Sequence, residues 1–486
     1  MADSPFGPFD ELAVRQDLDR RRLLQLALAA GATTAAGLAL AACGGSSSAV
    51  SSTTVKKATE AAAKKAGVVL QPGTRPFPDR PEGTDTLPQV EHIIVYMQEN
   101  HSYDSYFASL PRGDGLLKGG KGTPAAWNLD KDGTKVVSFH QADTCKVITG
   151  DHGWNATHTS VNGGKMDGFV KASGQHVMGY YDQTNLPFYH GLAMTFPLCD
   201  RWFASVPGPT HPNRRYLIAG TSSGLINTDV GKVMQNPVAA NGTIFDRLDA
   251  HGITWKDYAI DVGDVFLYPG KDLGAFLSST QDNRASFADF MADCRNGSLP
   301  AVSFIGPGTA EQYDEGSQDS RNGEAYSAAI VNAVMDSPLW EKSAIFISYD
   351  EHGGAYDHVP PPAAIAPDDV APMTAPGDAA GTFNQYGVRV PAMVVSPFSK
   401  KNYVSHTVRD HTAVLKFLET KWNLGALTLR DANADNLMDC FDFSKTSFAE
   451  PPQLPAAALA TATSECQPQP RPELNPQVRP RAASKS

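Results

Sequence analysis

Two pairs of residues with oxygen-bearing side chains each follow an apolar run of the sequence. Glu99 and Asn100 stand after one such run, and Asp350 and Glu351 stand after another. Carboxylates brought together without a cation repel one another and raise one another's pKa. Oxygen ligands from Asp, Glu and Asn suit a hard or borderline divalent cation. The pattern predicts one metal ion (Ca, Zn or Mg) held by these four residues. The alternative is that each pair only caps a loop or a helix.

A threonine lies between a Pro/Gly turn and a helical pattern. Thr210 follows the turn at residues 206–209 and precedes a helix-like run over 213–219. The N-terminus of a helix offers free N–H groups and a positive dipole end to a phosphate oxygen. A hydroxyl there that also binds a metal loses its proton more easily and becomes a nucleophile. We therefore predict that Thr210 is both nucleophile and metal ligand. The competing interpretation is an ordinary helix N-cap.

Histidines supply candidate proton donors. His152 and His158 share one polar segment, His352 and His358 flank the loop after the second acidic pair, and His211 adjoins the threonine. A phosphoryl site needs donors around the non-bridging oxygens and a proton donor for the leaving group. An isolated histidine is more often structural, and the residues alone do not assign a role to each.

Short apolar runs alternate with helical patterns along the middle of the chain. This alternation predicts an α/β fold, a three-layer sandwich with a mostly parallel central sheet. In such sheets sites form beyond the carboxyl ends of the strands, where both acidic pairs lie. The predicted strands are 92–97, 254–258, 301–305, 344–349 and 392–396, and the predicted helices include 244–251, 326–335 and 412–422.

The N-terminus has the features of an export signal. Arg20, Arg21 and Arg22 precede an apolar, Ala-rich stretch over 26–42, as in twin-arginine signals. Cys43 follows Leu-Ala-Ala and is the predicted site of lipidation, although a plain signal peptide cleaved before it is the alternative. We expect an exported protein, either a cell-envelope lipoprotein held at the membrane by its lipid or a secreted one. The twin-arginine export machinery would be its partner.

Composition sets the remaining boundaries. We predict a signal over 1–43, a flexible tether and linker over 44–88, a catalytic domain over 89–449 and a disordered tail over 450–486. The net charge of −11 argues against nucleic acid as a partner, which would require a basic face.

Several stretches of the sequence together resemble the bacterial phosphatidylcholine-type phospholipase C and acid phosphatase family. They include HIIVYMQENHSYDSYF (92–107), DHGWNATH (151–158), FPLCDRWFASVPGPTHPNR (196–214), AIFISYDEHGGAYDHVPPP (344–362) and DHTAVLKFLETKWNL (410–424). The resemblance implies an alkaline-phosphatase-like fold. It also implies a metal bound by the two acidic pairs and a nucleophile at Thr210. His152, His158 and His352 occupy positions of phosphate contacts or proton donors, while His358 and His211 are weaker candidates for substrate binding.

The resemblance leaves three functions open. The first is a phospholipase C that hydrolyses phospholipid head-group phosphodiester bonds. The second is an acid phosphatase that acts on small phosphate monoesters. The third is an inactive surface-binding lipoprotein, which the presence of every predicted ligand and of the nucleophile disfavours.

Overall fold

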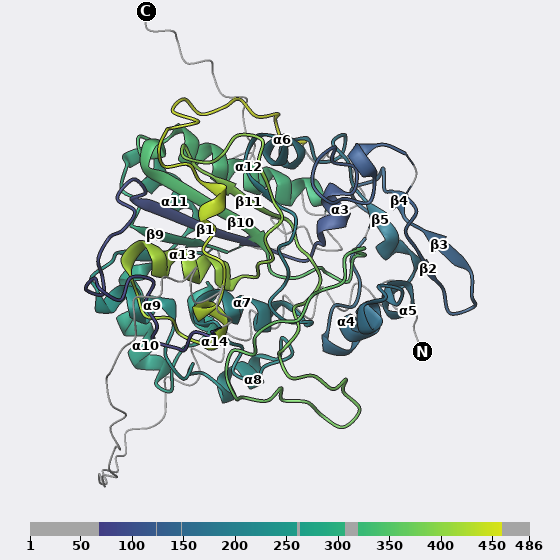
Figure 1. Ribbon diagram of the computed structural model, residues 1–486, viewed down its shortest axis with the longest axis horizontal. Coiled ribbons are helices and arrows are strands. Elements are labelled where there is room, and N and C mark those ends of the chain that lie inside the picture. Colours follow the sequence, from purple (N-terminus) through teal and green to yellow (C-terminus); the bar gives the residue numbers. More distant parts are fainter. Residues whose placement is uncertain (1–67, 123, 147, 260–262, 307–318, 459–486) are drawn as a thin grey trace, which may run out of the picture.

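An eight-stranded sheet forms the centre of the computed structural model, which describes residues 68–122, 124–146, 148–259, 263–306 and 319–458 (Figure 1). The strand order is β12-β6-β11-β10-β1-β9-β7-β8. Every pairing is parallel except those of β11, which runs antiparallel to both of its neighbours. The strands are β1 His92–Gln98, β6 Leu198–Cys199, β7 Trp255–Tyr258, β8 Arg284–Ala285, β9 Val302–Ile305, β10 Ser343–Tyr349, β11 Ala392–Val395 and β12 Val404–Ser405. The predicted α/β fold with a mostly parallel sheet is confirmed.

Helices cover both faces of this sheet (Figure 1). On one face, α12 contacts α6 and α11; on the other, α7 contacts α9 and α13. The three predicted helices are present, and the third has the predicted bounds. The longer helices are α6 Pro187–Thr195, α7 Thr210–Ala219, α9 Ile244–Ala250, α11 Phe287–Asn296, α12 Ser320–Asp336 and α13 Thr412–Trp422, and the shorter ones are α8 Val230–Gln235, α10 Leu273–Ser279 and α14 Leu429–Ala432.

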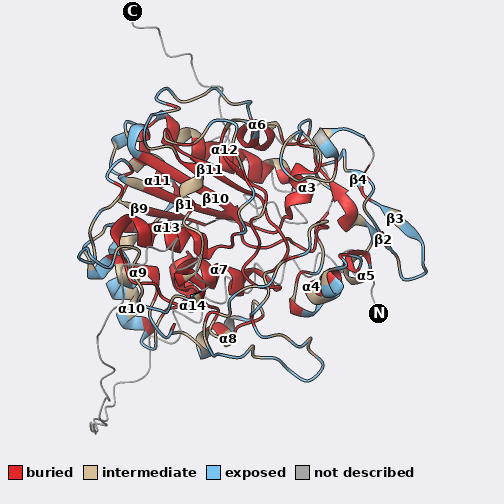
Figure 2. Ribbon diagram, viewed as in Figure 1, coloured by how far each residue is buried: buried red, intermediate tan, exposed pale blue. Residues whose placement is uncertain are grey.

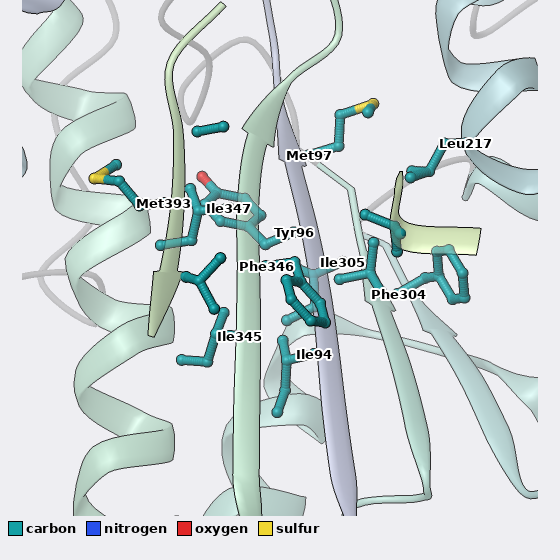
Figure 3. Packing of buried hydrophobic residues seen from close by; sticks show 14 of the residues in the cluster. Ile94, Tyr96, Met97, Leu217, Phe304, Ile305, Ile345, Phe346, Ile347 and Met393 are labelled. Carbon is teal, nitrogen blue, oxygen red and sulfur yellow. The ribbon is translucent and has the colours of Figure 1, made fainter. Parts of the chain in front are cut away.

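The two central strands are buried on both sides because successive side chains point to opposite faces. Tyr96 of β1 meets Tyr326 of α12 at a ring-centroid distance of 5.9 Å. Phe346 of β10 meets Phe417 of α13 at 4.7 Å. Figure 3 shows how the side chains of β1, β9, β10 and β11 fill this region. The continuous apolar character of both strands therefore follows from their central position.

A smaller unit lies beside the ends of β1 and β10 (Figure 1). Two short sheets pair β2 with β3 and β4 with β5. A separate hydrophobic cluster that includes Phe169, Met166 and Tyr356 holds this unit together. Its elements are α3 Tyr103–Phe107, β2 Trp127–Leu129, β3 Lys135–Val137, β4 Phe139–His140, α4 Trp154–Val161, α5 Phe169–Ser173 and β5 Gly179–Tyr180.

Packed chain extends past both boundaries of the predicted catalytic domain. The Thr86 amide donates to the Lys421 carbonyl at 2.6 Å, and Leu87 is buried. At the other end the Ala458 amide donates to Glu324 Oε2 at 2.9 Å. The predicted signal, its Cys43 and most of the predicted tail lie outside the described residues. Within the described ranges, no helix combines the length and the apolar character that crossing a membrane requires.

Candidate active site

The fold brings the two acidic pairs to one edge of the sheet. β1 and β10 are parallel neighbours, and Gln98 lies beside Tyr349 at their carboxyl ends. The Asn100 amide donates to Asp350 Oδ1 at 3.2 Å. The same carboxylate oxygen accepts the Glu351 amide at 2.7 Å. The pairs thus meet as predicted from strand order, and Asp350 also organises the loop backbone.

Thr210 is the first residue of α7, as predicted, and its side chain does not cap the helix. Pro209 holds the N-cap position, which has no side-chain cap hydrogen bond. The Thr210 hydroxyl instead donates to Glu99 Oε1 at 3.3 Å, and the residue is buried. The structure therefore favours a role at the acidic cluster over the capping interpretation.

Arg214 is a member of this cluster that the sequence analysis missed. It lies four residues after Thr210, on the same side of α7. Its Nε donates to Asp350 Oδ2 at 3.0 Å, and a terminal nitrogen lies 3.8 Å from Glu99 Oε2. Its other terminal nitrogen donates to Asp264 at 3.3 Å, at the start of the 3-10 helix Asp264–Leu267. The four-residue spacing from the predicted nucleophile was the signal that could have found it.

The cluster carries more negative charge than Arg214 balances. Glu99, Asp350 and Glu351 are all buried. Burial raises the pKa of Asp350 to about 8 against the lowering effect of Arg214, and the charges of Glu99 and Glu351 add to the rise. Glu351 Oε1 is buried and accepts no hydrogen bond from any described residue. Excess buried carboxylate with an unused oxygen is a donor set that fits a hard divalent cation.

A second cluster has a tighter grouping of metal-ligand atoms but a different charge balance. Among the described residues, ligand atoms of Asp104, Asp357 and His358 lie within 4.8 Å of one another. Arg389 donates to Asp357 Oδ1 at 2.9 Å and to Asp104 Oδ1 at 3.2 Å. The guanidinium and the imidazole therefore already neutralise these two carboxylates. This grouping does not include Glu99 and Asp350, which contact Arg214, or the neighbouring Glu351.

A second loop brings His152 to the acidic cluster. The Gly150 amide donates to the Gly353 carbonyl at 2.6 Å. Gly353 has φ +59°, and a side chain there would collide with the Asn100 carbonyl oxygen. Only glycine therefore allows the loops that carry Asn100, Glu351 and His152 to pack together.

The pKa of His152 is raised. Its Nδ1 contacts the Gly150 carbonyl at 2.8 Å, and its Nε2 lies 3.7 Å from Glu351 Oε1. Burial alone would lower the pKa, but the charges of Glu351, Asp151 and Asp350 and the contact with the Gly150 carbonyl together outweigh burial. His152 therefore tends to retain a proton next to the cluster.

The other predicted histidines occupy different surroundings. His352 is buried with Nδ1 3.2 Å from Glu351 Oε2, and its Nε2 has no hydrogen-bond partner among the described residues. His211 is buried as the second residue of α7. His158 contacts the Trp154 carbonyl through Nδ1 at 2.7 Å, and the two rings lie 4.4 Å apart. His358 directs its ring nitrogens at Asp104 (2.7 Å) and Asp114 (3.6 Å). Phosphate contacts by His158 and His358 stay predictions.

His411 contacts the backbone of Asp350 and is a second residue near the acidic cluster that the sequence analysis did not assign to the site. Its Nε2 contacts the Asp350 carbonyl at 2.7 Å, and its Nδ1 accepts from the Trp202 indole at 3.2 Å. Burial lowers its pKa to about 4, so the ring is neutral at pH 7. A neutral imidazole with both nitrogens engaged fixes the backbone of Asp350 and adds no charge.

An open cleft of about 330 Å³ adjoins the start of α7. His152 and Trp154 form part of one wall, and Pro209, the residue before Thr210, forms part of another. Asp151 and Asp378 add two carboxylates. The cleft is lined by residues 151–156, Pro209, 226–228 and Asp378. A group attached to a phosphate at Thr210 can therefore extend into a partly acidic cleft.

Comparisons with known proteins agree with the resemblance seen in the sequence. The chain is 30% identical over 445 residues to the non-hemolytic phospholipase C of Pseudomonas aeruginosa, covering 79% of this chain and 62% of that protein. It is 28% identical to phospholipase C B of Mycobacterium tuberculosis, covering 76% of this chain and 80% of that protein. It is 30% identical to non-specific phospholipase C5 of Arabidopsis thaliana, covering 67% of each. The chain thus spans about three fifths of the length of the Pseudomonas relative.

A solved structure with a similar chain course is a protein in the alkaline phosphatase superfamily from Vibrio parahaemolyticus. The TM-score is 0.35 at 9% identity, over 74% of this chain and 71% of that one. The family comparison is more direct, because residues 90–425 match the phosphoesterase family. That range contains both acidic pairs, α7 and the cleft. By this match the chain belongs to the phosphoesterase family.

Proposed function

We propose that this chain is an exported, metal-dependent phospholipase C that hydrolyses phospholipid head-group phosphodiester bonds with Thr210 as nucleophile. The observation that carries the proposal is the Thr210 hydroxyl, which donates to Glu99 at the N-terminus of α7 and beside an excess of buried carboxylate. Similarity to several proteins named phospholipase C supports the substrate class.

Glu99, Asn100, Asp350, Glu351 and the Thr210 hydroxyl would hold one divalent cation. When bound, such an ion lowers the pKa of a hydroxyl ligand and offsets the charge of a phosphate. The donor set supports this assignment because Glu99 and Asp350 share the single charge of Arg214, and the buried Glu351 Oε1 accepts no hydrogen bond from any described residue.

The protein's own groups then carry out two displacements. Thr210 Oγ attacks phosphorus while its proton passes to Glu99 Oε1, to which it already donates. The backbone N–H groups of the first turn of α7 stabilise the non-bridging oxygens. His152 Nε2 donates a proton to the leaving alcohol as its bond to phosphorus breaks. Water then attacks phosphorus and gives a proton to His152 Nε2, while the bond from phosphorus to Thr210 Oγ breaks and Oγ takes back its proton from Glu99.

The cleft supports a diester over a monoester. A monoester needs space for one leaving group, whereas a phospholipid also places a second group beyond the phosphate. The cleft next to Pro209 offers that space, with Asp151 and Asp378 to attract a cationic head group. An acid phosphatase would not require these features.

Two chromogenic substrates test the proposal. Metal-loaded protein should hydrolyse p-nitrophenylphosphorylcholine faster than p-nitrophenyl phosphate. A strong preference for the monoester would identify an acid phosphatase instead, and turnover of neither would favour an inactive binding protein.

Export and anchoring are tested separately by mass spectrometry. We expect Cys43 as the first residue of the mature protein, with acyl chains attached. An unmodified N-terminus elsewhere would refute the lipid anchor. It would leave the proposed chemistry intact.

A further inference from the structure

Large hydrophobic side chains are exposed together on the β2–β3 hairpin and at Phe139, the first residue of β4, which follows the hairpin after one residue. Trp127 is 44% exposed, Leu129 42%, Val137 39% and Phe139 37%. β2 and β3 pair in antiparallel fashion with Trp127 opposite Val137, so these two side chains share a face. Leu129 follows Trp127 by two positions and Phe139 follows Val137 by two, which continues the same face. Figure 2 shows the exposed hairpin at the edge of the molecule.

The opposite face of the hairpin is fixed to the unit that carries the site histidines. Asn128 is buried, donates to the Met166 carbonyl at 3.0 Å and accepts the Phe169 amide at 2.9 Å. Val136 packs against the hydrophobic cluster that contains Phe169. The Phe169 ring in turn meets the His352 ring at a centroid distance of 6.1 Å. The hairpin is therefore held at a defined position relative to the candidate active site.

The chemistry of the exposed face matches a phosphate-bearing apolar surface. Lys135 Nζ lies 4.7 Å from the centre of the Trp127 ring, which places a cation beside the apolar side chains. Tryptophan and lysine together suit the boundary between lipid head groups and acyl chains, where the ring is half-buried and the ammonium meets phosphate.

The size of the face argues against a second copy of the chain as its occupant. Four partly exposed side chains of this size offer roughly 300 Å² of apolar surface. A stable protein interface buries about 800 Å² on each partner. Shallow contact with a bilayer has no such minimum, because additional contacts form wherever the protein meets the lipid.

We propose that the face formed by Trp127, Leu129, Lys135, Val137 and Phe139 is a membrane-contact site that inserts into the head-group region of a phosphatidylcholine bilayer. The purpose of this contact, bringing a lipid substrate to the cleft, rests on the proposed function. The contact itself depends only on the hairpin and can be measured without catalysis.

Vesicle flotation tests the contact. Full-length protein carrying Thr210→Ala, so that lipid is not consumed, and Cys43→Ala, so that no acyl chain contributes, is mixed with phosphatidylcholine vesicles. Adding Trp127→Ala should weaken the vesicle partition coefficient about tenfold, since one large aromatic side chain no longer enters the interface. Val137→Ser should weaken it about threefold.

Val408→Ser is the matched control, because Val408 is 44% exposed outside the hairpin and should leave partitioning unchanged. Hairpin variants that float like the parent would overturn the proposal, as would a parent that does not bind vesicles. Light scattering that shows a parent dimer dissolved by Trp127→Ala would also overturn it, in favour of a second copy.

Turnover separates this proposal from the proposed function. For turnover, the protein keeps its native Thr210 and carries only Cys43→Ala. In this background Trp127→Ala should hydrolyse soluble p-nitrophenylphosphorylcholine at the wild-type rate. Its rate on phosphatidylcholine vesicles at low lipid concentration should fall about tenfold. Equal loss on both substrates would show that the hairpin acts on the site and not on the membrane. If neither substrate reacts while flotation behaves as expected, the proposed function fails and the membrane contact stands.

Discussion

Two clusters of charged residues just beyond the ends of β1 and β10 contain the same kinds of side chain but differ in their balance of positive and negative charge. In each, a buried arginine lies between carboxylates that follow the two strands. Arg389 contacts Asp104 and Asp357, and His358 adds a second cation. Around Arg214, by contrast, Glu99, Asp350 and Asp264 share one guanidinium, with Glu351 nearby in sequence. In the first cluster, two cations balance two carboxylates, and we call it the complete cluster. In the second, one guanidinium faces three carboxylates, and we call it the incomplete cluster.

This difference separates a structural cluster from a candidate site. A complete set of buried charges needs nothing further and links the elements that supply it. Burial raises the pKa of a carboxyl in both clusters, to about 6 for Asp357 and to about 8 for Asp350, where the charges of Glu99 and Glu351 add to the rise. The incomplete cluster also contains the Thr210 hydroxyl, which lies at the start of α7 and donates to Glu99 rather than capping the helix. Proximity of ligand atoms alone selects the cluster of Asp104, Asp357 and His358, whereas the charge balance favours the cluster around Arg214.

The largest expected effect comes from removing the hydroxyl of the incomplete cluster. Thr210→Ala should reduce turnover of p-nitrophenylphosphorylcholine at least ~10³-fold, because it deletes the proposed nucleophile. Thr210→Ser keeps a hydroxyl and should retain most of the activity. Both variants should melt like wild type, and Thr210→Ala activity within tenfold of wild type would remove Thr210 from the mechanism.

Removal of a cation should affect only the incomplete cluster. Dialysis against a chelator should lower activity about 10³-fold, because a bound cation supplies several kcal/mol of charge stabilisation. Restoration by Ca, Zn or Mg, followed by elemental analysis, should give one ion per chain in wild type and in Asp357→Asn. The Asp350→Asn protein should bind none. Equal metal content in both variants would contradict the assignment.

Substitution in the complete cluster should change stability without changing chemistry. Asp357→Asn leaves Arg389 short of one buried partner and should lower the free energy of unfolding by about 3 kcal/mol. Its turnover per folded molecule should stay near wild type. Asp350→Asn should show the reverse, lost turnover with stability unchanged or increased, because it relieves repulsion. Urea unfolding and activity measured on the same samples compare the two.

The smallest effect concerns the pH dependence of the complete cluster. Burial lowers the pKa of His358, but the charge of Asp104, the hydrogen bond to it and the charge of Asp357 together outweigh burial and raise the pKa to about 9 from 6.5. A raised histidine pKa stabilises the folded state fully below pH 6.5, and this stabilisation is lost as pH rises through 9. His358→Gln should therefore cost about 2 kcal/mol at pH 6 and little at pH 10. A cost that does not depend on pH would show that the imidazole is uncharged.

The sheet and its functional edge could be predicted because their signals are local. Continuous apolar runs identify central strands, and residues directly after parallel strands must share an edge. The positions of Glu99 and Asp350 follow from that rule, and the position of Thr210 follows from the Pro/Gly turn before a helical pattern. The packing of residues 68–88 could not be predicted from the sequence, because a Pro-rich segment has no apolar periodicity. Asn423 helps to hold this segment against the domain, since its side-chain oxygen accepts a hydrogen bond from the Phe77 amide at 2.8 Å.

The arginines were missed for a related reason. A buried arginine is defined by the carboxylates that tertiary structure places around it. The four-residue spacing from Thr210 could have indicated Arg214, but no comparable spacing indicates Arg389. Arg389 lies 32 residues from Asp357 and 285 from Asp104. His358 contacts Asp104 in the same cluster, and its assignment to substrate binding stays a prediction.

The stereochemical course at phosphorus tests the central claim, a covalent step at Thr210, most directly. Each in-line displacement inverts phosphorus, so two successive displacements restore its configuration. A substrate made chiral at phosphorus with oxygen isotopes should therefore give product with retained configuration. Inverted product would mean that water attacks the substrate in one step, and Thr210 would not be a nucleophile.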